Sequence, residues 1–358
     1  MSSHSLVAVV SVIVAACLAS APASGQGQAR GATNNTPSKT VPRTPDGRPD
    51  LQGFWTTQTF TPLQRPDYLG PKEFFTEEEV VALQQQFNAD GVDPLARDAI
   101  NIEDPDRRTS RLDQTKREPS YVHYDNAIWL RTPVPKGLTS RRTSLITDPK
   151  DGKLPPLTAE AQRRAAAAAA AAAQPSAFDG YETRPLPERC IAWAHEGPPI
   201  LPPAYNDIHH ILQTPDYVVI HPEVATHLPR IIPIDGRPHL SDSLRQFAGD
   251  SRGHWEGDTL VVDTKNYNER RRWQGSSGAL HVVERFRRVD ADRIHYEFTV
   301  DDPTTWTRPW SAEVPMVKTE GQRYEYACHE GNHDIRHILE IHRNMEEQAA
   351  ESSRQGPK

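Results

Sequence analysis

The second half of the chain alternates between apolar and polar side chains with the period of β-strands. The segments that show this pattern are 217–220, 230–234, 259–264, 281–286, 294–300 and 324–328. They are short, rich in β-branched and aromatic residues, and in several places separated by turns such as Glu256-Gly257-Asp258. Because no β–α–β pattern interrupts them, we expect a mainly β domain over about residues 180–345. Its sheet should be antiparallel and form either a barrel or a sandwich.

Two segments of the first half carry helical patterns instead. A capping box at residues 76–79 precedes an apolar run, which predicts a helix near 76–88. Thr158 begins a second helix that reaches about residue 173 and contains nine consecutive alanines. This helix has no apolar face to bury, so we expect a solvated spacer. The remainder of 45–179 is charged and broken by proline, and it should wrap irregularly around the β domain.

The N-terminus has the pattern of an export signal. Residues 6–18 form an apolar run, and Ala21-Pro22-Ala23 fits a small-x-small cleavage site, so residues 1–23 are predicted to be a secretory signal peptide. The alternative is a lipoprotein signal, with a lipid anchor at Cys17. In either case the protein should be secreted or periplasmic. We further expect a flexible linker at 24–44, a disordered tail at 346–358, and no transmembrane span.

Composition and cysteine content narrow the picture further. The chain has 358 residues, 36% of them hydrophobic, and a net charge of −7. This mild acidity argues against a nucleic-acid partner, which would need a basic face. No cofactor fingerprint is present, so no cofactor is expected. Cys190 and Cys328 are the two cysteines beyond the signal segment, which predicts a disulfide in an exported protein. Two buried free thiols are the alternative.

Several motifs spread over most of the chain resemble those of a known family. They are TPDGRPDLQGFW, RTSLITDPKDGKLPPLTAEAQRR, GDSRGHWEGDTLVVDT, DDPTTWTRPW and YEYACHEGN. Together they resemble a family of secreted proteins from soil and marine bacteria to which no activity is assigned. The resemblance implies secretion and one shared fold, and it transfers no catalytic residue. It also implies that His333 stands where relatives commonly carry another residue.

The stretch 249–263 concentrates polar side chains immediately before an apolar strand, as a binding or catalytic site requires. Its Gly-Asp-Ser-Arg-Gly segment matches the GxSxG pattern of hydrolases, but a strand follows where such enzymes have a helix. We therefore do not expect Ser251 to be a nucleophile. Asp250 and Arg252 should instead pair and brace a hairpin.

The segment 329–333 has the spacing of a zinc-binding HExxH motif, and His337 adds a third imidazole. Zinc chemistry would need a helix here, whereas Gly331-Asn332 favours a turn. Three interpretations stay open: a metal site, an acid–base or ligand-binding pair formed by His329 and Glu330, and a pair that is merely hydrogen-bonded. Among these interpretations, we assign no residue as a metal ligand and take His329 and Glu330 as the catalytic candidates.

A second aromatic group lies in the proline-bounded stretch 301–310. Trp306, Arg308 and Trp310 either line a pocket for an aromatic or glycosidic ligand or plug the end of a barrel. Trp255 and Glu284 join the ligand-binding candidates.

Two classes of function follow. The first is a secreted β-domain protein that binds a small, aromatic or glycosidic ligand. The alternative is a secreted hydrolase or lyase that uses His329 and Glu330 with Asp250 and Arg252, with metal assistance in one version. The enzyme hypothesis requires these side chains to converge in one concave pocket.

Overall fold

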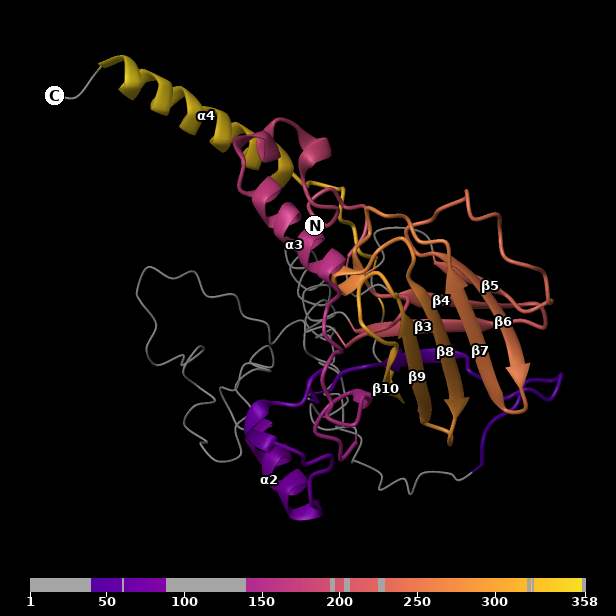
Figure 1. Cartoon of the computed structure of the whole chain (residues 1–358). Coiled ribbons are helices and arrows are strands. Elements are labelled where there is room, and N and C mark those ends of the chain that lie inside the picture. Colours follow the sequence, from indigo (N-terminus) through magenta and orange to yellow (C-terminus); the bar gives the residue numbers. More distant parts are fainter. Residues whose placement is uncertain are drawn as a thin grey trace, which may run out of the picture. The chain divides into compact units, whose positions relative to one another are not determined.

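The computed structural model describes residues 40–59, 61–87, 140–193, 197–202, 207–224, 229–320, 323 and 325–355 (Figure 1). The predicted signal peptide, Cys17 and most of the 24–44 linker lie outside this set. In the described part of the chain, no helix combines the length and the apolar character needed to cross a bilayer.

A ten-stranded antiparallel sheet dominates the structure. Its strands are β1 (Gly53–Thr56), β2 (Ile146–Asp148), β3 (Ile208–Gln213), β4 (Tyr217–Pro222), β5 (Arg230–Pro233), β6 (Asp250–Glu256), β7 (Thr259–Lys265), β8 (His281–Arg288), β9 (Arg293–Asp301) and β10 (Trp310–Lys318). They follow the order β5-β4-β3-β1-β10-β9-β8-β7-β6, and β2 pairs with β10 off this path. The sheet curls into a nearly closed barrel. The predicted mainly β antiparallel fold is therefore confirmed, as a barrel.

The two ends of the strand order, β5 and β6, meet through side chains. Arg230 of β5 donates to the Ser251 hydroxyl of β6 at 2.9 Å. Further along, Gly253 of β6 faces β5 so closely that an added Cβ would lie 2.6 Å from Ile234 Cγ2 and 3.0 Å from Ile232 Cγ2. A residue without a side chain is needed there because any other would hold the two strands apart.

Side chains fill the interior of the barrel. The alternation along β8 and β9 sends Phe286, Phe298 and their inward neighbours into one apolar cluster. Trp273 and Trp310 stack within it at 5.9 Å between ring centroids, and Trp306 meets Trp310 edge-on at 5.8 Å. Trp306 and Trp310 are both almost completely buried in this cluster, so their burial favours a packing role over the lining of an open pocket.

The two helices predicted in the first half are present. Helix α2 (Glu77–Phe87) begins with the capping box: Thr76 Oγ1 accepts from the Glu79 backbone N–H at 3.2 Å, and the Glu79 carboxylate accepts from the Thr76 N–H at 2.7 Å. Helix α3 (Ala159–Ala172) starts at Thr158, whose hydroxyl accepts from Ala161 N. Within α3 only Ala161 is buried, as expected for a solvated spacer.

Among the described residues, the irregular regions also contain four 3₁₀ turns: η1 (Asp67–Leu69), η6 (Pro175–Phe178), η7 (Tyr181–Thr183) and η8 (Trp273–Gly275). The region 45–179 also does more than wrap the barrel, because β1 lies between β3 and β10 in the sheet. The end of the segment expected to be a flexible linker, 24–44, also contacts the barrel. Arg43 forms an ion pair of 2.6 Å with Asp258 at the β6–β7 turn.

The C-terminal expectations need correction. The segment 324–328, predicted as a strand, has no strand among its described residues. A helix, α4 (Asp334–Gln355), occupies most of the region expected to be a disordered tail. Its apolar residues Ile335, Ile338 and Leu339 recur at the helical spacing of three and four, and Leu339 is buried. This short apolar stripe is the feature of the sequence from which the helix could have been predicted.

Candidate functional site

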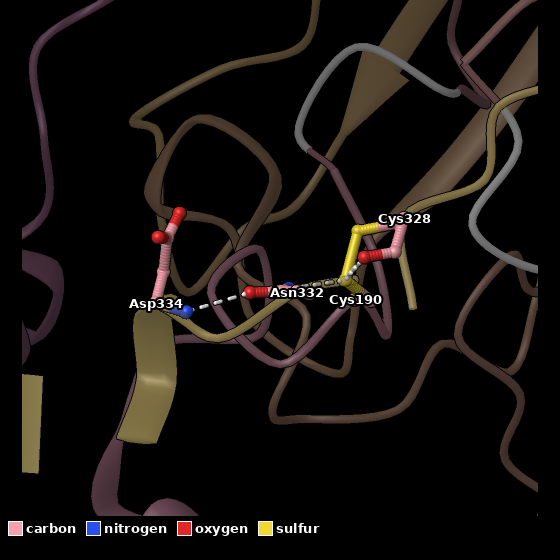
Figure 2. Close-up of a disulfide and its surroundings, with 4 residues drawn as sticks. All are labelled: Cys190, Cys328, Asn332 and Asp334. Carbon is pink, nitrogen blue, oxygen red and sulfur yellow. Dashed lines mark hydrogen bonds between the residues drawn. A yellow bond between two sulfur atoms is a disulfide. The ribbon is translucent and has the colours of Figure 1, made fainter. Parts of the chain in front are cut away.

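The predicted disulfide between Cys190 and Cys328 is present, with 5.8 Å between the two Cα atoms (Figure 2). It joins the turn that follows η7 to the irregular segment that precedes α4. Asn332 reinforces this junction: its Nδ2 donates to Cys190 Sγ at 3.2 Å, and its Oδ1 accepts from the Asp334 backbone N–H at 3.1 Å (Figure 2). The start of α4 is therefore tied to the disulfide by one amide side chain.

The HExxH-like segment forms a turn. Gly331 adopts a positive φ of 70°, a conformation that glycine tolerates without strain, and α4 begins only at Asp334. His329 and His333 consequently do not share a helix face, and both are exposed. The helical geometry on which zinc binding at His329, His333 and His337 depends is not formed.

A cavity of about 560 Å³ opens beside the disulfide. Two aromatic side chains line it, Trp193 and Tyr326, whose rings meet edge to face with 6.3 Å between centroids. Three acidic residues line it as well, Glu188, Glu330 and Asp334. Aromatic faces combined with a few polar groups in a concave surface are typical of small-molecule sites. Sequence reasoning missed Trp193 and Tyr326, which lie 133 positions apart and are brought together next to the cross-link.

The four predicted catalytic residues do not converge on this cavity. Glu330 lines it, whereas His329, Asp250 and Arg252 are absent from its lining. Asp250 and Arg252 do pair as predicted, with 2.6 Å between Arg252 Nη1 and Asp250 Oδ1. They lie on β6, where the Asp250 carboxylate also accepts from the Leu240 backbone N–H at 2.9 Å. Their role is thus to hold the loop before β6 against the barrel.

Asp250 begins a chain of alternating carboxylates and imidazoles that the sequence did not reveal. His239 Nδ1 lies 2.8 Å from Asp250, His239 Nε2 lies 2.8 Å from Asp263, and His281 Nε2 lies 2.6 Å from Asp263. The hydrogen bond to Asp263 raises the pKa of His281. Partial burial opposes ionisation of Asp263, but the bonds from His281 and His239 outweigh it and lower the pKa of that carboxyl. This series of hydrogen-bonded groups begins at the buried Asp250 and ends at the partly exposed His281.

Glu284 has a place different from the one expected. It is fully buried inside the barrel, and its carboxylate faces Arg230, with 3.0 Å between Arg230 Nη1 and Glu284 Oε1. Tyr296 donates to the same oxygen at 2.8 Å, while Ser251 and Thr264 accept from Arg230 at 2.9 Å each. The expected ligand contact of Glu284 is therefore replaced by a role in the core. Ser251 is likewise buried, and its hydroxyl accepts from Arg230.

The remaining ligand-binding candidates are also engaged elsewhere. Arg308 is exposed and pairs with Asp148. Trp255 packs partly buried against the core cluster, and the Arg48 guanidinium lies 5.7 Å from its ring centroid. Neither residue lines the cavity beside the disulfide, so the expected pocket around Trp255, Trp306, Arg308 and Trp310 does not form there.

One group of described side chains has metal-ligand spacing. The ligand atoms of His295, Glu297 and Glu313 all lie within 4.8 Å of one another on the outward faces of β9 and β10. Arg142 already approaches Glu313, with 3.7 Å between Nε and Oε1. The Arg142 guanidinium therefore already provides a positive charge beside Glu313, which is the role that a bound metal ion would have.

A second titratable cluster lies on β3 and β4 and at their ends. Burial raises the pKa of Glu223 to about 6, and the nearby Asp207 adds to the effect. Burial also lowers the pKa values of His210 and His221. His210 stacks on Phe54 with 4.3 Å between ring centroids. Glu223 therefore changes its charge near pH 6, and burial disfavours the charged forms of both histidines.

The cavity is the feature of this set in which a concave surface, an aromatic pair and acidic residues coincide. Comparison with protein-family models, curated proteins and solved structures gives no match. The case for a functional site therefore rests on the geometry around Trp193, Tyr326 and Glu330.

Proposed function

We propose that the protein binds a small organic molecule in the cavity beside the Cys190–Cys328 disulfide. The observation that carries this proposal is the pairing of Trp193 with Tyr326 inside a cavity of about 560 Å³. That volume falls within the range of roughly 300–1,000 Å³ that is usual for small-molecule sites. Aromatic side chains offer large contact areas at little cost in conformational entropy.

Ligand binding is better supported than catalysis. Hydrolysis or elimination needs a base or nucleophile oriented by a second group beside the reacting atom. In this cavity Glu330 is the one member of the proposed catalytic set on the lining. The residues intended to assist it, Asp250 and Arg252, bond to each other and to the loop before β6.

We place this function outside the cytoplasm, in the secreted or periplasmic space. The disulfide is compatible with an oxidising compartment, and the N-terminal sequence has the pattern of a signal peptide. The motif resemblance to secreted bacterial proteins supports the same placement.

The proposal can be tested by saturation-transfer NMR on the exported protein with a mixture of small aromatic, aliphatic and glycosidic compounds. We expect at least one compound to bind, and its signal to be lost in Trp193→Ala and reduced in the milder Trp193→Phe. Tyr68→Ala, which removes a partly exposed ring outside the cavity lining, serves as the matched control. Binding that is equal in the wild type and both Trp193 variants, or no binding up to millimolar concentration, would overturn the proposal.

A further inference from the structure

We propose that the ligand of this cavity is an organic cation, with an ammonium or similar group seated against Trp193 and Tyr326 and facing Glu330. This inference rests on the proposed function and names the class of ligand. It follows from the charges that line the cavity and from the nature of its aromatic surface.

The charge of the lining is one-sided. Among the described residues that line the cavity, three are acidic and none is lysine, arginine or histidine. The carboxylate of Glu188 is matched, because Arg184 donates to it from Nε at 2.8 Å and from Nη2 at 3.0 Å. Glu330 and Asp334 therefore leave an excess of negative charge.

The excess is concentrated at Glu330. Asp334 is the first residue of α4, and the positive end of the helix dipole offsets part of its charge. For Glu330 the described structure provides neither a salt bridge nor a helix terminus. Glu330 is exposed and is one of the residues that line the cavity. A cationic ligand would supply the missing partner, whereas an anionic ligand would be repelled.

The aromatic pair favours the same ligand. Trp193 and Tyr326 stand nearly perpendicular, at 88°, and the faces of aromatic rings carry the negative part of their quadrupole. Cations are attracted to such faces, most strongly to tryptophan, and rings combined with carboxylates form the cages that recognise ammonium groups. A neutral aromatic compound or sugar would use the rings but leave the carboxylates without a counter-charge.

The inference is tested by comparing two probes of equal shape by isothermal titration calorimetry. Choline carries a quaternary ammonium group, and 3,3-dimethylbutan-1-ol is its neutral isostere. We expect choline to bind at least tenfold more tightly than the alcohol, and added salt to weaken choline alone. Glu330→Gln should weaken choline at least fivefold and leave the alcohol unchanged. Glu347→Gln makes the same change of charge at an exposed site of α4 outside the cavity and should have no effect.

The outcomes separate this inference from the proposed function. If the alcohol binds as tightly as choline, or if neutral or anionic compounds bind in a Trp193-dependent manner while choline does not, the cation inference fails and the binding function stands. If no compound of either experiment binds in a Trp193-dependent manner, both fail. Unchanged melting temperatures of Glu330→Gln and Trp193→Phe establish that a loss of affinity is local.

Discussion

Replacing Glu284 with glutamine would remove the negative charge that compensates Arg230 inside the barrel. Glu284 is completely buried, and 9% of the Arg230 side chain is exposed, so water cannot take over the role of the carboxylate. Burial by itself would lower the pKa of Arg230, but the facing carboxylate outweighs burial and raises it. In the variant the guanidinium stays charged, because arginine does not release its proton in proteins.

The expected cost is large. Breaking a buried, hydrogen-bonded ion pair by removing one partner destabilises proteins by about 3–5 kcal/mol. Glutamine keeps the shape and an acceptor oxygen for the Tyr296 hydroxyl, which donates at 2.8 Å in the wild type. Most of the loss should therefore come from the uncompensated charge. Replacing both partners, in Arg230→Met/Glu284→Leu, should recover most of the stability because no buried charge remains.

Urea unfolding followed by tryptophan fluorescence measures these changes, with an unchanged m value as the sign that the fold is retained. Glu256→Gln is the matched control, because its carboxylate pairs with Arg285 at 2.7 Å on the exposed outer surface. This control should leave the unfolding midpoint almost unchanged. A Glu284→Gln variant that loses less than about 1 kcal/mol, or a double variant as unstable as the single one, would refute the reasoning.

Three further predictions concern the seam, a buried acid and the cross-link. Gly253→Ala should cost about 1–3 kcal/mol in urea unfolding, because its Cβ would meet Ile234 at 2.6 Å; a neutral substitution would mean that β5 does not approach as described. Because the pKa of Glu223 is raised from 4.5 to about 6, this group stabilises the fold below pH 4.5, and the contribution is lost as the pH rises through 6. Glu223→Gln should abolish that decline of at most about 2 kcal/mol before solvent screening, and an identical pH profile in both proteins would contradict it. Cys190→Ser opens a cross-link that spans 138 positions and should lower the free energy of unfolding by about 4 kcal/mol; a titratable thiol at Cys190 or Cys328 in the denatured, unreduced wild type would contradict the disulfide.

The sequence predicted those parts of the fold whose signals are local. Alternation along 281–286 predicted the strand β8, in which Glu284 and Phe286 are both buried. The partner of Glu284 was not predictable, because Arg230 lies 54 positions away and only closure of the barrel brings it near. Strand β10 escaped recognition because its sequence contains Pro315 and follows a proline-bounded tryptophan segment, features more typical of a connection.

For the candidate site, too, some features were predictable from the local sequence and others were not. The disulfide followed from counting cysteines, and the Gly331-Asn332 turn followed from the conformational preferences of those residues. The aromatic pair did not follow, because Tyr326 was assigned to a strand and Trp193 carries no local signal. Their adjacency depends on where the cross-link places two irregular segments. Such a relation between distant segments leaves no periodicity in the sequence.

The barrel and the cavity are held in place by different kinds of interaction. The barrel is fixed by backbone ladders and by a buried ion pair whose donors and acceptors are matched. The cavity is built from segments without strand pairing, and sites on loops are held less accurately than sites on strands or helices. Here one covalent bond and the amide of Asn332 supply the missing restraint, since Asn332 contacts Cys190 and also the first backbone N–H of α4. A ligand that binds there would gain affinity from this preorganisation. The position of Glu330, two residues after Cys328, then follows from the cross-link as much as from the local sequence.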